Sequence, residues 1–308
     1  MERDIIAWLR TNFPARPPLA VGIGDDAAVL QPQTGSTVIT TDAIVDGVHF
    51  ESARQSCRRI GHKSAAVNFS DLAAMGAVPT ALVVALVLPQ NTTLPHVQQL
   101  YAGIDEVCSR WNAVLAGGDT NFGPGPLVIC GTAVGRIPPD QSPWLCSGAK
   151  PGDEIFVSGS FGGSILGKHL DFDPRCDLVK DLAGKFEINA ATDVSDGLAF
   201  NLGVILEASG CGAVIDLSSI PISAAAKQAE GNQTNGKSAL DHALYDGEDF
   251  ELILVTRPTE GARIRRDPIV SSKLTRIGSV VTGSGIRATA ADGSVQSLPI
   301  RGFSHGGD

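Results

Sequence analysis

The chain has 308 residues, with 33 acidic against 24 basic side chains and a formal net charge of −9. This acidic balance, without any run of Lys or Arg, argues against a nucleic-acid-binding protein and against a surface for anionic membranes. The length favours two domains of about 150 residues each, and the 43% hydrophobic content is ample for two cores. The six cysteines form no C-x-x-C pair, so we expect reduced thiols in a cytoplasmic protein, not a zinc site or a disulfide framework.

The first half of the chain alternates between helix-like and strand-like patterns. Residues 2–12 place Ile5, Ile6 and Leu9 on one helical face, and this charged, amphipathic start does not resemble a signal peptide. The longest apolar run, residues 81–89, is about half as long as a membrane helix requires. The same patterns predict strands at 37–45, 81–88, 113–116 and 127–134, and helices at about 58–75 and 94–110.

An aperiodic stretch rich in Pro, Ser and Gly at 136–150 predicts a domain boundary. We therefore divide the chain into an N-terminal domain, 1–137, and a C-terminal domain, 138–308. The second domain again reads as an α/β layer. Its predicted elements are strands within 152–160, 187–197, 213–217, 251–255 and 276–281, and helices starting in 161–170 and spanning 197–210.

Short acidic clusters tied to glycine or to hydroxyl residues recur along the chain. GIGDDA places Asp25 and Asp26 after two glycines that allow close approach of a ligand, although an ordinary surface turn explains this cluster equally well. TTD ends an apolar strand and offers oxygen ligands from Thr40, Thr41 and Asp42, a donor set that suits magnesium better than zinc. Such carboxylates are suited to holding hard cations against a polyphosphate.

Further candidate residues lie in the first half, and two of them, His49 and Asp71, carry two interpretations each. His49 is either a surface histidine or a contact to a phosphate, since no second histidine lies at metal-ligand spacing. Asp71 has apolar neighbours, so it is either paired or metal-bound, or it is exposed in the first turn of a helix capped by Ser70. Gly118 and Asp119 follow a buried strand, where backbone amides and a carboxylate suit a phosphate with its metal.

The second half adds two acidic motifs. DVSDG carries Asp193, Ser195 and Asp196 at the start of a helix, and helix capping explains one of the two acids but hardly both. YDGEDFEL carries Glu248 and Asp249 before a strand, a pattern that is also typical of a solvated turn.

A partial phosphate-loop pattern, GGSILGK at 162–168, is followed by His169 where the motif requires Ser or Thr, so we reject it. No local signature of a Ser/His/Asp or Cys/His nucleophile is present. Direct phosphoryl transfer, which depends on positioning and on neutralisation of charge, agrees best with the carboxylates.

In this order the motifs resemble those of the thiamine-monophosphate kinases, within the aminoimidazole ribonucleotide synthetase-like superfamily of ATP-using enzymes. The likeness runs from GIGDDAAVL through TTDAIVDGVHF, AVNFSDLAAMGAVP, LAGGDT, SGAKPGD and DVSDGL to DGEDFEL, and so covers most of the chain. It implies a two-domain PurM-like fold of α/β (α+β) class. It also implies a homodimer made by pairing the N-terminal sheets, which would carry ATP and magnesium, while the C-terminal α/β domain completes the nucleotide and substrate site.

The activity implied is transfer of the γ-phosphoryl group of ATP to thiamine monophosphate, without a phosphoenzyme and with several Mg²⁺ ions. By motif position, the resemblance assigns the magnesium ligands Asp26, Thr40, Thr41, Asp42, Asp71, Asp119, Asp193 and Asp196. It assigns the nucleotide contacts Tyr101, Gly118, Asp119 and Ser195, and the thiamine-phosphate contacts His49, Glu248 and Phe303. Asp42 and Asp119 are expected to be indispensable for turnover.

Two positions depart from the family pattern. Cys146 stands where an arginine often precedes SGAKPGD, and this leaves open whether another basic residue holds the nucleotide. Asp246 stands where a glycine commonly precedes the Gly-Glu pair. Three alternatives remain: another superfamily member, such as an aminoimidazole ribonucleotide synthetase or a selenophosphate synthetase; a non-catalytic paralogue that binds magnesium and nucleotide; and an acidic scaffold whose motifs are only turns.

Overall fold

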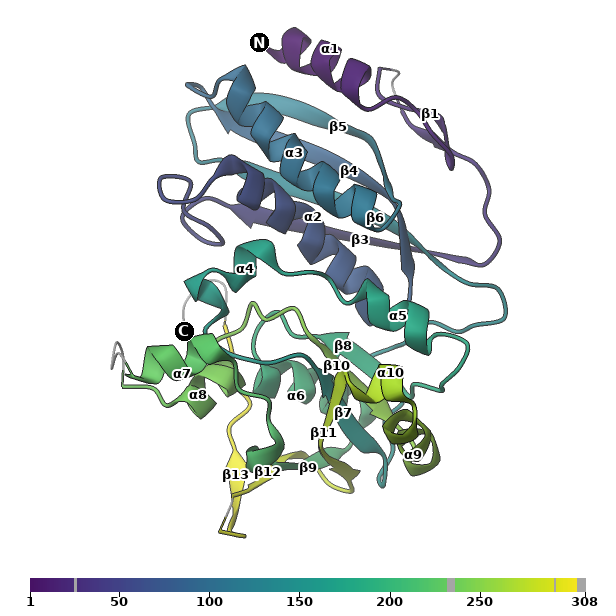
Figure 1. Ribbon diagram of the computed structural model, residues 1–308, viewed down its shortest axis with the longest axis vertical. Coiled ribbons are helices and arrows are strands. Elements are labelled where there is room, and N and C mark those ends of the chain that lie inside the picture. Colours follow the sequence, from purple (N-terminus) through teal and green to yellow (C-terminus); the bar gives the residue numbers. More distant parts are fainter. Residues whose placement is uncertain (25–26, 232–235, 291, 304–308) are drawn as a thin grey trace. The chain divides into compact units, whose positions relative to one another are not determined.

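The computed structural model describes the chain except for residues 25–26, 232–235, 291 and 304–308 (Figure 1). The chain forms two compact units, which are described separately. The first unit comprises Met1–Leu72, Ala77–Gln141 and Leu170–Cys176, and the second comprises Ala73–Gly76, Ser142–His169 and the chain from Asp177 onward. The functions that we assigned to 1–137 and to 138–308 stay predictions.

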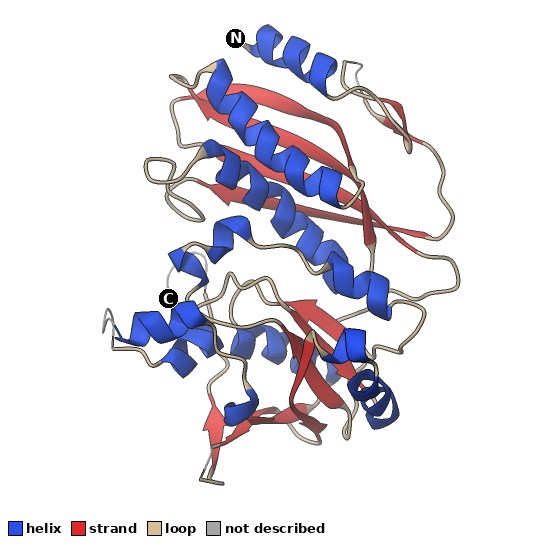
Figure 2. Ribbon diagram, viewed as in Figure 1, coloured by secondary structure: helices blue, strands red, loops and turns tan. Residues whose placement is uncertain are grey.

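The first unit is built on a four-stranded sheet with the strand order β3-β6-β4-β5. Antiparallel pairing joins β3 to β6 and β6 to β4, and β4 and β5 are parallel. Helices α2 and α3 cover one face of this sheet (Figure 2). The bounds are β3 Ser36–Val45, α2 Cys57–Ala74, β4 Val78–Pro89, α3 Leu94–Arg110, β5 Val114–Gly123 and β6 Val128–Ile137.

Glycines allow these elements to approach closely. A Cβ on Gly61 of α2 would lie 1.9 Å from the carbonyl oxygen of Leu100, and one on Gly103 of α3 would lie 1.8 Å from that of Arg58. The two helices therefore cross with their backbones in contact. Bulkier side chains of both helices, such as Phe69 of α2 and Ile104 of α3, are fully buried.

Smaller elements complete the first unit. Helix α1 (Glu2–Asn12) buries Ile5 and Leu9 of the predicted apolar face, whereas Ile6 is exposed. Strands β1 (Leu19–Val21) and β2 (Val29–Leu30) pair with each other. Leu19 packs with Ala81 and Val114, which lie on the strands of the main sheet.

The second unit contains a seven-stranded sheet in the order β13-β12-β9-β11-β7-β10-β8. Its neighbouring strands are antiparallel except for the parallel pair β12 and β9. Helix α6 packs its apolar side chains onto this sheet, and β10 is buried along its whole length. The strands are β7 Glu154–Ser158, β8 Ala190–Asp193, β9 Gly212–Asp216, β10 Leu252–Thr256, β11 Leu274–Val281, β12 Gly285–Thr289 and β13 Val295–Leu298.

Short helices fill the connections between these strands. Two are 3₁₀ turns, η1 Ser164–Leu166 and η2 Leu217–Ser219. The others are α4 Lys168–Asp171, α5 Cys176–Leu182, α6 Leu198–Ser209, α7 Ala224–Gly231, α8 Ala239–Tyr245, α9 Pro258–Arg266 and α10 Pro268–Ser271. Within the described residues, no helix is both long and apolar enough to cross a membrane.

The predicted two-domain α/β class is confirmed, and so are the long elements of the first half. The helix predicted to start within 161–170 is short and begins only at Lys168. Gly162 and Gly163 have φ values of 89° and 69°, which an α-helix cannot contain, and only a 3₁₀ turn and the short α4 follow.

Candidate functional site

Strand β3 and helix α2 bring three candidate metal ligands of the first unit together. The Thr40 hydroxyl donates a hydrogen bond to Asp71 Oδ2 at 2.5 Å, and the Asp42 N–H donates to Asn68 Oδ1 at 3.2 Å. Thr40 and Asp42 point to the same face of β3 because side chains alternate along a strand. Thr40 and Asp42 therefore lie on the face of the sheet that α2 covers, and Asp71 belongs to α2 itself. Asp26 lies outside the described residues.

Thr41 points the other way. Its hydroxyl donates to the carbonyl oxygen of Gly131 at 2.8 Å and lies 3.1 Å from the hydroxyl of Thr132 on β6. Because this side chain is on the opposite face from Asp42, it does not share an ion with Asp42 within one chain. The assignment of Thr41 as a metal ligand stays a prediction.

Asp119 also lies on the face opposite to Asp42. The β4–β5 register pairs Asp119 with Ala85, which is exposed, and pairs the buried Thr120 with the buried Leu86. Asp119 is exposed and accepts a hydrogen bond from Asn121 Nδ2 at 2.6 Å. Within one chain, the two carboxylates expected to be indispensable are thus separated by the sheet.

Gly118, which precedes Asp119, has a structural reason to be glycine. A Cβ at this position would lie 1.9 Å from the carbonyl oxygen of Val84 on the neighbouring strand. Gly117 has open space around its missing side chain. The glycines before Asp119 therefore serve strand packing at one position and leave the backbone accessible at the other.

His49 follows β3 in an exposed loop and presents a defined donor. Its Nδ1 accepts a hydrogen bond from the Val45 N–H at 3.1 Å, so the neutral ring carries its proton on Nε2. The fully buried Lys63 donates to the His49 carbonyl oxygen at 2.7 Å. The Val45 N–H at the end of β3 and the buried Lys63 together fix the position of His49. The contact from Lys63 was not predicted from the sequence.

Tyr101, the candidate adenosine contact, is 2% exposed. Its ring lies 6.2 Å from that of Trp8 and 6.1 Å from that of Phe13, and burial raises the pKa of its hydroxyl. Tyr101 therefore lies in an aromatic cluster with Trp8 and Phe13. Its contact with a nucleotide stays a prediction.

In the second unit, the DVSDG loop is held by the main chain of the DGEDFEL segment. The carbonyl oxygen of Val194 accepts from the Phe250 N–H at 2.8 Å, and that of Ser195 accepts from the Glu248 N–H at 2.6 Å. Glu248 and Phe250 have φ values of 55° and 49°, which non-glycine residues seldom adopt. This strain lies where Asp193, which is 8% exposed, ends β8.

The remaining acids of DGEDFEL hold the loop that contains GGSILGK. Asp249 is 1% exposed and accepts hydrogen bonds from the Gly162 N–H at 3.0 Å and from the Ser164 hydroxyl. Burial raises the pKa of Asp249 to about 6, against the opposing effect of the Ser164 hydroxyl. Lys168 donates to the buried Glu251 at 2.9 Å, so the lysine of this partial motif is tied to the fold.

Asp246, the departure from the family pattern, takes part in the same support. Its carboxylate contacts His242 Nδ1 at 2.6 Å and Lys237 Nζ at 2.9 Å, and it accepts from the Gly163 N–H at 3.3 Å. The extra acid is therefore occupied by structural contacts. Cys146, the other departure, is half-buried, and its carbonyl oxygen accepts from the Ser209 hydroxyl at 3.5 Å.

Among the residues that the structure describes, no three His, Cys, Asp or Glu side chains come close enough together to hold a metal ion. The candidate ligands instead occur as carboxylates with neighbouring hydroxyls, such as Asp71 with Thr40 and Asp196 with Ser195. All of these donors are hard oxygens. Magnesium typically binds through one or two carboxylates plus substrate phosphates and water, so the donor chemistry agrees with that ion.

Comparisons with known proteins identify the family. Residues 24–137 match the family model "AIR synthase related protein, N-terminal domain", and residues 150–290 match "AIR synthase related protein, C-terminal domain". A thiamine-monophosphate kinase from Rhodopirellula baltica is 41% identical over 99% of this chain and 98% of its own length.

Solved structures agree with this result. A thiamine-monophosphate kinase from Stenotrophomonas maltophilia matches with a TM-score of 0.78 and 32% identity, over 94% of this chain and 95% of its own. AaThiL complexed with AMPPCP and TMP matches with a TM-score of 0.77 and 26% identity, over 99% and 96%. Escherichia coli HypE, a hydrogenase maturation protein, shares the fold at 21% identity and a TM-score of 0.79. The chain belongs to the thiamine-monophosphate kinase family of the AIR synthase related proteins.

Proposed function

We propose that this protein transfers the γ-phosphoryl group of ATP to thiamine monophosphate and so forms thiamine diphosphate in the cytoplasm. The observation that carries the proposal is the match, over 99% of this chain, to a structure complexed with AMPPCP and TMP. The 41% identity of a full-length kinase relative supports the same reaction.

Each unit contributes carboxylates to the proposed chemistry. Asp42 and Asp71, with the Thr40 hydroxyl, would hold Mg²⁺ in the first unit, and Asp193 and Asp196 would do so in the second. The bound ions would neutralise charge on the phosphates during transfer. The acceptor is a phosphate oxygen that is already ionised, so the chain needs no general base.

Three residues are proposed to bind the acceptor. His49 presents its Nε2 proton and would donate it in a hydrogen bond to a phosphate oxygen. Glu248 lies in the strained segment that holds DVSDG, and its negative charge suits the thiazolium cation of thiamine. Phe303, which is 49% exposed, offers a ring face to an aromatic substrate.

The open face of the first unit's sheet supports a homodimer. Among the residues that the structure describes, no helix of the unit covers that face, where Ile39 of β3 is 68% exposed and Val87 of β4 is 40% exposed. Cross-strand register places Ala43, Cys130 and Ala85 side by side on the same face. An apolar sheet face of this kind is suited to packing on a second copy.

Dimerisation through this face would place Asp119 at the interface, because Asp119 lies on the open side and Asp42 lies under α2. We therefore propose that Asp119 completes a site together with the partner subunit. This arrangement accounts for two candidate catalytic acids that lie on opposite faces of one sheet.

The function is tested by the choice of acceptor. The protein is incubated with ATP and magnesium and with thiamine monophosphate, thiamine or an aminoimidazole precursor, and each product is identified by mass spectrometry. The proposal predicts thiamine diphosphate from thiamine monophosphate alone. Phosphorylation of free thiamine, or conversion of the aminoimidazole precursor, would assign the chain to a different reaction.

A further inference from the structure

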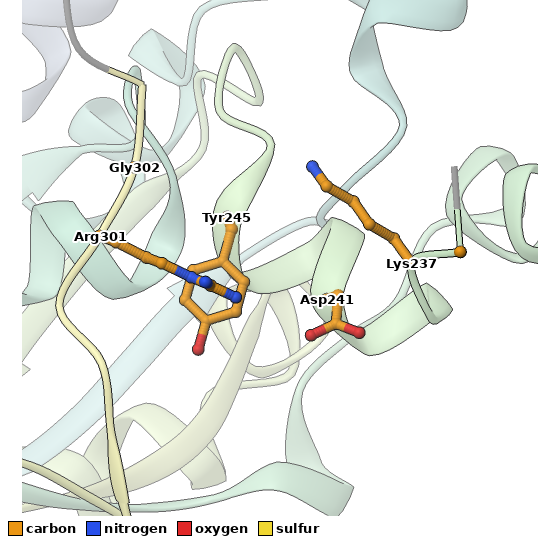
Figure 3. A pocket seen from close by; sticks show the side chains of 6 residues that line it. Lys237, Asp241, Tyr245, Arg301 and Gly302 are labelled. Carbon is orange, nitrogen blue, oxygen red and sulfur yellow. The ribbon is translucent and has the colours of Figure 1, made fainter. Parts of the chain in front are cut away.

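The chain segment that follows β13, Ile300–Phe303, lies against the DVSDG loop and the helices beside it. We call this segment the C-terminal clasp. Figure 3 shows Arg301 with its guanidinium over the ring of Tyr245, and Gly302 directly after it. Arg301, Gly302 and Tyr245 line a pocket of about 370 Å³, together with Lys237 and Asp241.

The clasp binds the main chain of Asp196. The Phe303 N–H donates a hydrogen bond to the Asp196 carbonyl oxygen at 3.0 Å. A Cβ on Gly302 would lie 2.1 Å from that same oxygen and 2.7 Å from Cβ of Phe200. Because Gly302 does not have a positive φ, the glycine is required here for space and not for backbone conformation.

Contacts on both sides keep the clasp in place. Ile300 packs on α6 at Gly203, where a Cβ would lie 2.5 Å from Cγ2 of Ile300. The Arg301 guanidinium lies 4.2 Å from the centroid of the Tyr245 ring, at the end of α8. This contact is a cation–π interaction between the guanidinium and the ring face.

Asp196 is thereby held at both of its backbone polar groups. Its N–H donates to Asn201 Oδ1 on α6 at 3.0 Å, and its carbonyl oxygen accepts from Phe303. Its carboxylate accepts from the Ser195 hydroxyl at 2.8 Å. With the contacts from Phe250 and Glu248, three consecutive carbonyls of this loop, those of residues 194–196, receive backbone donors.

We infer that the C-terminal clasp is a positioning element, which fixes the Asp196 carboxylate for the magnesium–nucleotide complex. The hydrogen bond from the Phe303 N–H to the Asp196 carbonyl oxygen also holds Phe303 in place. The inference rests on the proposed function in that Asp196 is a metal ligand. Without the clasp, one side of the DVSDG loop is free to move. The Asp196 carboxylate must then become ordered when magnesium binds. Partners that orient metal ligands typically change metal affinity by about 10–100-fold when removed.

The direct test is Gly302→Ala, with Gly231→Ala as the matched control, because a Cβ on Gly231 meets nothing within 4 Å. We expect Gly302→Ala to expose the Phe303 amide to hydrogen exchange. We also expect calorimetry to show about tenfold weaker binding of magnesium with a non-hydrolysable ATP analogue. The control should match the wild type in both measurements. Exchange of the Phe303 amide without any loss of affinity would overturn the inference.

A second pair of variants keeps the test informative if Gly302→Ala does not fold. Tyr245→Ala removes the ring under Arg301, whereas Tyr245→Phe retains it, so only the alanine variant should weaken nucleotide binding. Equal binding by both variants contradicts the clasp. If the wild type fails to phosphorylate thiamine monophosphate while Gly302→Ala still binds the analogue more weakly, the proposed reaction is wrong and the clasp stands.

Discussion

The two units hold their candidate ligands by different means. In the first unit Thr40, Asp42 and Asp119 lie on strands whose register decides which face each side chain occupies. In the second unit Asp196 lies in a loop that is held by backbone hydrogen bonds from segments distant in sequence. Register therefore controls the first set of ligands, and tertiary contacts to the main chain control the second.

The largest expected effect is loss of a carboxylate from the first unit. Asp42→Asn and Asp119→Asn should each lower kcat by about a thousandfold or more, because a charge that stabilises the transition state is removed. The thermal unfolding temperature of each variant should stay close to that of the wild type. Turnover retained by both variants would contradict their assignment.

Mixing these two variants tests whether Asp42 and Asp119, which lie on opposite faces of the sheet, act together across two subunits. If Asp119 acts together with Asp42 of the partner subunit, a dimer of one Asp42→Asn and one Asp119→Asn subunit keeps one intact site. Subunits that are unfolded and refolded together should then recover measurable activity. The absence of recovery, with mixed dimers demonstrated by mass spectrometry, would show that each site uses one chain alone.

Strand packing beside Asp119 predicts an effect on stability. Gly118→Ala places a Cβ against the Val84 carbonyl oxygen and should lower the free energy of unfolding by about 1–3 kcal/mol. Gly117→Ala, where nothing lies within 4 Å, is the matched control and should be close to neutral. Chemical denaturation measures both, and equal stabilities would show that β4 and β5 do not approach as described.

The smallest effect is a pH dependence in the second unit. Burial raises the pKa of Asp249 from the usual range of an aspartate to about 6, so its protonated form is favoured in the folded chain. This contribution to stability is complete below about pH 4 and is lost as the pH rises to about 6. Asp249→Asn should remove that part of the pH dependence of thermal unfolding. An unchanged difference between pH 4 and pH 7 would contradict the raised pKa.

The regular elements of the first unit were predictable because apolar residues recur with the period of a helix or of a strand over long segments. The helix at 94–110 and the strand at 37–45 follow directly from periodicity. Strand β13 was missed because three of its four residues are exposed and show no alternation. Within 161–170 the helix α4 begins only at Lys168, because a glycine turn precedes it and leaves the apolar Ile165 and Leu166 exposed.

The candidate site was only partly predictable. Acids next to glycine or hydroxyl residues marked its motifs, and period-two alternation would have placed Thr41 on the face opposite to Asp42. The face of Asp119 depends on an irregularity in the β4–β5 register, which has no local signal in the sequence. The support from Lys63, Asp249 and the C-terminal clasp arises from contacts between distant segments.

The central claim is best tested by following the terminal phosphate of ATP. ATP labelled at its γ-phosphate is incubated with the protein, magnesium and thiamine monophosphate, and the thiamine products are separated. The account predicts that the label appears in the terminal phosphate of thiamine diphosphate, in amounts that match the ADP released. Release of labelled inorganic phosphate with thiamine monophosphate unchanged would contradict it.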